Sequence, residues 1–80
     1  MRLDKYLKVS RLIKRRTVAN EACDAGKVTV NGTIARASYN VKQGDIIELT
    51  LGARSVKVKV TDIKETVRKE DASTMYEPIL

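Results

Sequence analysis

The sequence predicts an α+β domain in which two N-terminal helices pack on a small, mostly antiparallel sheet. Apolar residues recur at helical spacing over the first 25 positions and alternate at every second position after residue 27. With 80 residues, the chain can build only one small hydrophobic core. We therefore expect one domain over residues 1–63, followed by a short C-terminal extension over residues 64–80, where neither pattern continues.

The first predicted helix covers residues 2–9. Its apolar positions recur at i, i+3 and i+4, and they are Leu3, Tyr6 and Leu7. The positions on the opposite arc are all basic: Arg2, Lys5 and Lys8. At about 100° per residue the two groups lie on opposite sides of the helix. One side is therefore expected to enter the core, and the other to face outward.

A second helix is predicted from residue 14 or 15 to residue 25. Its small apolar face, which would allow close packing against the first helix, consists of Val18, Ala19, Ala22 and Cys23. Gly26 ends the helix, because glycine readily adopts the left-handed conformation that follows many helix C-termini. The basic run at residues 11–16 therefore covers the turn between the helices and the first turn of the second one.

The remaining predicted elements are strands joined by tight turns. Three segments have the alternation typical of strands, and they lie at residues 28–30, 46–51 and 56–63. Asn31-Gly32 follows the first of them and is typical of a β-hairpin turn, because both residues tolerate a positive φ. Residues 64–80 show no period and contain Pro78, so we predict at most a short helix near residues 69–76.

The positive charge of the chain is concentrated near its N-terminus. The net charge is +6, and residues 1–16 account for all of it, with seven cations and the single acid Asp4. The other 64 residues hold nine basic and nine acidic side chains. Cations near a helix N-terminus oppose the helix dipole, so local stability does not explain them. A solvated face is one interpretation of this cluster; the pattern favours a surface that binds a polyanion, with phosphate near the second helix's free N–H groups.

Several other functions find no support in the composition. The chain has no histidine, which removes the usual general base and the commonest transition-metal ligand. Its one cysteine, Cys23, can form no intrachain disulfide, and we interpret it as a small core residue of a protein from a reducing compartment. Asp4 lacks the partner that a catalytic carboxylate needs, so we expect it to stabilise the helix start or to orient an arginine. We expect no catalytic residue, no metal and no cofactor.

The N-terminus and the hydropathy pattern predict a soluble, cytoplasmic protein. No stretch approaches 18 consecutive apolar residues, and charges interrupt the first eleven positions, where a signal peptide would be apolar. We expect no contact with a membrane.

Four short motifs, taken in order, resemble the S-four RNA-binding domain, which also occurs in RNA pseudouridine synthases and tyrosyl-tRNA synthetases. They are "RLDKYL" at residues 2–7, "SRLIKRRT" at 10–17, "VNG" at 30–32 and "GD" at 44–45. The likeness extends over residues 2 to about 51. It implies the alpha-L fold, in which two helices pack on a small sheet and their basic face lies on structured RNA.

The resemblance assigns an RNA-binding role to the cations that match the motif. These are Arg2, Lys8, Arg11, Lys14, Arg15 and Arg16. Lys5 belongs to the same patch, and Arg36 lies just past the predicted hairpin, so we include both as candidates. Arginine suits bidentate contacts with phosphate and stacking on bases.

Within the family, a stand-alone chain of this kind is similar to the group related to heat-shock protein fifteen, and its length and ending resemble a compact Gram-positive member. That likeness implies a monomer that binds large-subunit rRNA and peptidyl-tRNA on obstructed large ribosomal subunits. There it would hold the tRNA in the P site while an RqcH-type tailing factor adds alanine without a template.

Three alternatives remain open at this stage. The protein could recycle stalled large subunits that carry nascent-chain tRNA, as the heat-shock branch is expected to do. It could modify RNA, although no residues remain for a catalytic domain. It could also be an adaptor whose residues 64–80 contact another protein.

Overall fold

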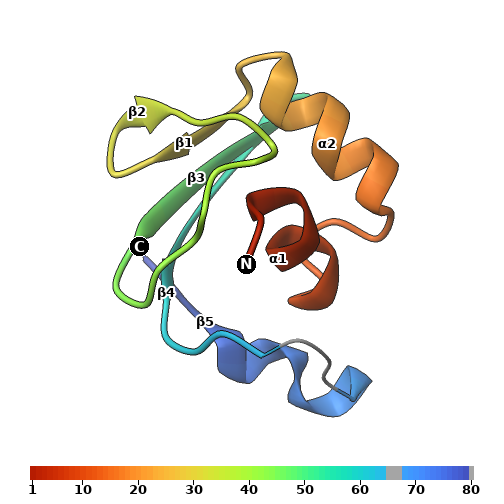
Figure 1. Ribbon diagram of the computed structural model, residues 1–80, viewed down its shortest axis with the longest axis vertical. Coiled ribbons are helices and arrows are strands. Elements are labelled where there is room, and N and C mark those ends of the chain that lie inside the picture. The colour runs from red at the N-terminus through yellow and green to blue at the C-terminus, as the bar shows by residue number, and fades with distance from the viewer. Residues whose placement is uncertain (65–67, 80) are drawn as a thin grey trace.

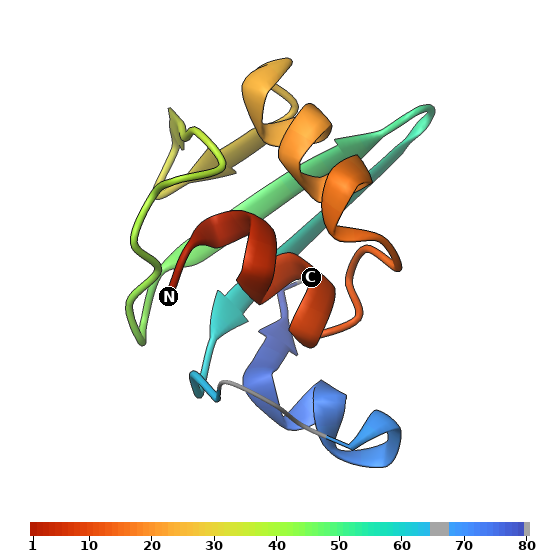
Figure 2. The same ribbon diagram turned by 45° about the vertical axis from the view of Figure 1, so that its right-hand side comes forward.

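The computed structural model describes residues 1–64 and 68–79 and consists of a helical layer on a sheet (Figure 1). Helices α1 (Leu3–Val9) and α2 (Arg16–Asp24) both lie on the same face of the sheet, as the turned view also shows (Figure 2). The strands are β1 (Val28–Val30), β2 (Thr33–Ile34), β3 (Ile46–Leu51), β4 (Arg54–Val60) and β5 (Tyr76–Pro78). Every pair is antiparallel, in the order β2-β1-β3-β4-β5. The predicted fold class is confirmed.

Both predicted helices are present. Each is followed by a tight turn that contains one residue in the left-handed backbone conformation. In α1, Leu3, Tyr6 and Leu7 are completely buried, as predicted. At the end of α2, Gly26 has a φ of 77°, and its N–H donates to the carbonyl of Cys23 at 3.1 Å. This conformation is the glycine-favoured helix ending that the sequence predicts.

One residue of the predicted face of α2 was placed wrongly. Ala19, Ala22 and Cys23 are buried, whereas Val18 is 44% exposed. Val18 lies one position, or about 100°, from Ala19, so it falls beside the buried stripe instead of in it. Cys23 is a core residue, as predicted, because its side chain is almost completely buried. Burial, with Asp4 and Asp24 nearby, raises the pKa of its thiol to about 11. At neutral pH the thiol is therefore protonated.

The core lies between the helices and the inner face of β1, β3 and β4. In the register, Ile47 faces Val58, and both side chains are completely buried. The intervening residues, such as Glu48 and Lys57, also face each other but are exposed. This alternation follows from the two-residue period of a strand, and it confirms the strands predicted at these positions.

A buried carboxylate links the two turns that the sequence marks with "VNG" and "GD". Asn31 has a φ of 53° in the β1–β2 turn, and its amide donates to Asp45 at 3.1 Å. The carbonyl oxygen of the same amide accepts a bond from the N–H of Ile46 at 2.9 Å. Tyr39 Oη and the N–H of Lys42 also donate to Asp45, at 3.0 and 2.9 Å. The two motifs therefore occur together because they form one hydrogen-bonded network.

The C-terminal segment contributes more to the fold than the sequence indicates. A 3₁₀ helix (Lys69–Met75) lies where a short helix was expected, and β5 then pairs with β4, with Tyr76 opposite Val60. Met75 is completely buried in the core. The division at residue 63 stays a prediction, but the described residues after it form part of the same sheet and core.

Tyr6 fastens α1 to this C-terminal segment, and removing its hydroxyl is expected to lower the free energy of unfolding by about 1 kcal/mol. The Tyr6 hydroxyl donates to the carbonyl of Met75 at 2.6 Å, and both residues are completely buried. Burial raises the pKa of Tyr6, so the hydroxyl remains a donor at neutral pH. Urea unfolding of Tyr6→Phe measures the loss. Tyr76→Phe is the control, because the Tyr76 hydroxyl has no partner among the described residues, and equal effects of the two substitutions would contradict the prediction.

Candidate nucleic-acid interface

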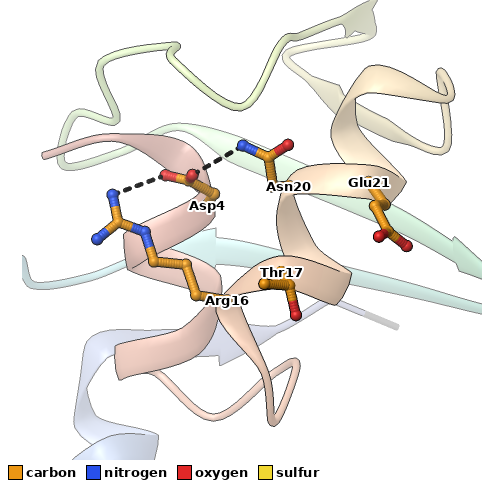
Figure 3. Close-up of a pocket in the computed structure, with 5 residues that line it drawn as sticks. All are labelled: Asp4, Arg16, Thr17, Asn20 and Glu21. Atoms are coloured by element: carbon orange, nitrogen blue, oxygen red, sulfur yellow. Dashed lines mark hydrogen bonds and ion pairs between the residues drawn. The ribbon is translucent and has the colours of Figure 1, made fainter.

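A buried carboxylate lies at the centre of the basic surface. Asp4 is 2% exposed, and its oxygens accept bonds from both helices and from the chain that precedes α1. Arg2 donates through Nε to Oδ1 at 3.2 Å and through Nη2 to Oδ2 at 3.3 Å. The N–H of Lys5 donates to Oδ1 at 2.8 Å, and Asn20 donates to Oδ2 at 3.2 Å. Arg16 completes the set at 3.5 Å from Oδ1 (Figure 3).

This arrangement holds two guanidinium groups together at the surface. Arg2 precedes α1 and Arg16 begins α2, so the two arginines are distant in sequence but share one carboxylate. Their side chains are 51% and 50% exposed, so each keeps donors free to contact a ligand. The expectation that Asp4 forms an ion pair with a neighbouring arginine is confirmed.

The N-terminus of α2 has the features of an anion-binding helix end. No side chain caps it, and its first turn contains no acid. Lys14, Arg15 and Arg16 are all exposed around it. Beside this end is an open hollow of about 350 Å³, lined by Asp4, Arg16, Thr17, Asn20 and Glu21 (Figure 3). Unpaired N–H groups and cations together can bind a phosphate group.

The other predicted cations lie at two places, one on and just after α1 and one on the loop that follows β2. Lys8 and Arg11 are exposed at the end of α1, near the turn that leads to α2, and Lys5 is half-buried on α1. Arg36 is exposed on the loop that follows β2. The next residue, Ala37, accepts a bond from the N–H of Asp4 at 3.2 Å and donates to the Asp24 carboxylate at 3.4 Å. The loop that carries Arg36 therefore adjoins both helices. Contact of these four cations with RNA stays a prediction.

Sequence reasoning missed Asn20 as part of the site. Asn20 lies four residues after Arg16 on α2, so both side chains point toward Asp4 (Figure 3). A polar residue on the packed side of a short helix was the available signal, because such a residue needs a buried partner.

Acid is expected to destabilise the fold through Asp4 and Asp45. Burial raises the pKa of each carboxyl, but hydrogen bonds outweigh it, chiefly from Asn20 and Arg2 at Asp4 and from the N–H of Lys42 at Asp45, so both pKa values lie below 3.8. Carboxyl groups with a lowered folded-state pKa contribute stability that is complete above the unfolded-state pKa and is lost as the pH falls through the folded-state pKa.

The melting temperature should therefore be nearly constant between about pH 5 and 7 and fall below about pH 4. Thermal unfolding followed by circular dichroism from pH 7 to pH 2.5 measures this dependence. Asp45→Asn should have a shallower decline than wild type. A melting temperature that rises on acidification would contradict the assignment.

The fold and the basic helical face define a small RNA-binding domain. The chain matches the model of the S4 domain over residues 1–47, which is the S-four family indicated by the motifs. The chain belongs to this family. Among the described residues, no helix has the length and apolar character needed to cross a membrane.

Two relatives indicate to which branch of the family the chain is similar. The chain is 60% identical over 77 residues to the RQC P-site tRNA stabilizing factor of Halalkalibacterium halodurans. This match covers 96% of the chain and 88% of that protein. It is 53% identical to the protein of the same name from Streptococcus pneumoniae, over 99% of the chain and 90% of that protein. The compact member that the sequence resembles, RqcP, is the factor of this name, so the predicted branch is confirmed.

A solved structure links the chain to the heat-shock group as well. The trimeric structure of Vibrio cholerae heat shock protein 15 superposes with a TM-score of 0.92 at 31% identity. The match covers 99% of this chain and 81% of that chain. The predicted relation to heat-shock protein fifteen is therefore confirmed.

Proposed function

We propose that the protein binds rRNA and tRNA on obstructed large ribosomal subunits and stabilises peptidyl-tRNA in the P site during template-free C-terminal alanine tailing. The observation that carries this proposal is the 60% identity, over 96% of the chain, to a factor whose name specifies stabilisation of P-site tRNA. Protein biosynthesis is thus the process in which the chain acts, as a component of ribosome-associated quality control.

The mechanism that we propose is binding without catalysis. The rigid α1–α2 layer presents cations to two RNA molecules at once and favours one position of the tRNA relative to the subunit. Phosphate contacts supply the affinity, and the combined shape of rRNA and tRNA supplies the specificity. The shared Asp4 contact supports this mechanism, because it fixes Arg2 and Arg16 before RNA binds.

The proposal also covers the partners and the organisation of the chain. The protein would act as a monomer in the cytoplasm with an RqcH-type tailing factor. Residues 1–63 would form the RNA-binding domain, and residues 64–80 an extension that completes the sheet through β5.

The second candidate is recycling of stalled large subunits, which the similarity to heat shock protein 15 supports. Alanine tailing on purified large subunits that carry peptidyl-tRNA, with and without the protein, separates the two functions. With an RqcH-type factor and alanyl-tRNA supplied, we expect the protein to lengthen the tails several-fold. Unchanged tails together with release or transfer of the tRNA would favour recycling instead.

A further inference from the structure

Arg11 occupies a backbone conformation that its own residue type disfavours. Its φ is 63°, in the left-handed region, and among the described residues only Asn31 shares this property without being glycine. Asn31 is a residue that tolerates this region, and its side chain is bonded to Asp45 in the β1–β2 turn. Arg11 has a Cβ atom and no such compensation, so its conformation requires a different explanation.

The turn around Arg11 can be compared with the turn at the end of α2. The N–H of Arg11 donates to the carbonyl of Lys8 at 3.1 Å, three residues earlier, and the N–H of Gly26 donates in the same way to Cys23 at 3.1 Å. The φ values of Arg11 and Gly26 are 63° and 77°. The left-handed position after α2 is therefore occupied by glycine, the residue that this position favours, whereas the equivalent position after α1 is occupied by arginine.

Local interactions do not account for arginine at this position. The side chain is exposed and has no ion-pair partner among the described residues. Its neighbours in sequence include the cations Lys8 and Lys14 but no acid, so like charges surround it. Attraction to the C-terminal end of the α1 dipole is favourable, but Lys8 in the last turn already supplies it.

The turn that carries Arg11 is fixed at both ends. Ser10 before it is buried, with its N–H bonded to the carbonyl of Tyr6 at 2.9 Å. Ile13 after it is also buried, and its N–H donates to the carbonyl of Leu7 at 3.1 Å. The backbone of Arg11 therefore cannot relax without disturbing two buried residues, while its own side chain is exposed.

From these observations we infer that the α1 turn gives up stability in order to present Arg11 to an RNA phosphate. Strained backbone conformations persist where function requires them. The inference rests on the proposed function and adds to it that binding, and not folding, selects arginine at residue 11. Replacing Arg11 with glycine should consequently raise the stability of the protein and lower its affinity for RNA.

Arg11→Gly and Arg11→Ala test the inference as a matched pair, because both remove the charge but only glycine removes the strain. The Gly variant should melt about 4 °C or more above the Ala variant and at least as high as wild type. Both should bind purified large ribosomal subunits carrying P-site tRNA about tenfold more weakly than wild type. Their log affinity against log salt should be less steep by about 0.7 to 0.9, as expected for one lost phosphate contact.

Arg16→Ala, measured in the same binding assay, separates failure of the inference from failure of the proposed function. Wild-type binding by Arg11→Gly, with weakened binding by Arg16→Ala, would overturn the inference and leave the proposed function standing. Wild-type binding by both variants would overturn the proposed function. An Arg11→Gly protein that melts below Arg11→Ala would show that the position carries no strain and would also overturn the inference.

Discussion

Arg16→Ala is expected to abolish association of the protein with large ribosomal subunits while leaving its fold intact. Arg16 begins α2 at the uncapped helix end, next to the hollow beside Asp4, so its loss removes both a charge and part of the anion-binding geometry. Its side chain is half-exposed and lies beside Arg2, which shares Asp4 with it. A ligand that bridges the two arginines would lose one of its two charge-assisted contacts.

The fold should survive this substitution because Arg16 contributes little to the buried network. Its bond to Asp4, at 3.5 Å, is the longest of the set, and the carboxylate keeps its bonds from Arg2, Asn20 and the N–H of Lys5. Half-exposed ion pairs typically contribute at most about 1 kcal/mol. The melting temperature of Arg16→Ala should therefore remain within a few degrees of wild type.

Sucrose-gradient sedimentation of tagged protein from cells, with the tRNA content of each fraction measured, provides the test. Wild type should travel with large subunits that carry tRNA, and Arg16→Ala should stay at the top of the gradient. Lys59→Ala is the control, since it removes one positive charge from an exposed side chain of β4. Its neighbours Val58 and Val60 are buried, so Lys59 lies on the face of the sheet opposite the helices. Unchanged co-sedimentation of a folded Arg16→Ala protein would refute the proposed interface.

The elements that the sequence predicts correctly are those in which local pattern and tertiary burial agree. The alternation in β3 and β4 places Ile47 and Val58 inward because each strand has one buried face. Asn31-Gly32 turns the chain as predicted because the required positive φ is a local property. The basic patch is likewise visible from charge alone, since exposed cations need no tertiary contact to be recognised.

The features that the sequence does not predict depend on contacts between distant residues. β5 has three residues, includes Pro78 and shows no alternation, so only its pairing with β4 defines it as a strand. The networks around Asp4 and Asp45 join segments separated by more than ten residues. Arg11 shows the same limit, because no sequence pattern indicates a left-handed arginine.

Asp4→Asn is expected to lower the free energy of unfolding by about 2–3 kcal/mol and the melting temperature by about 10–20 °C. The substitution keeps the shape of the side chain but replaces one carboxylate oxygen with an NH₂ donor. Asp4 is buried, and both of its oxygens accept bonds, so the new donor would face either Asn20 and Arg2 or the N–H of Lys5. A buried donor without an acceptor is the costly outcome, because the loss of water is no longer compensated.

The cost should be large relative to the total stability, because a domain of this size is stabilised by only about 5–10 kcal/mol. Chemical denaturation of wild type and Asp4→Asn at pH 7 measures it, and Glu21→Gln is the matched control. Glu21 lines the same hollow, but its side chain is exposed and its carboxylate has no partner among the described residues, so the substitution should change the free energy of unfolding by no more than about 0.5 kcal/mol. Equal effects of the two substitutions would mean that the carboxylate of Asp4 does not hold the helices together. The expected difference would instead establish that the buried carboxylate of Asp4 stabilises the helical layer from which Arg2 and Arg16 extend.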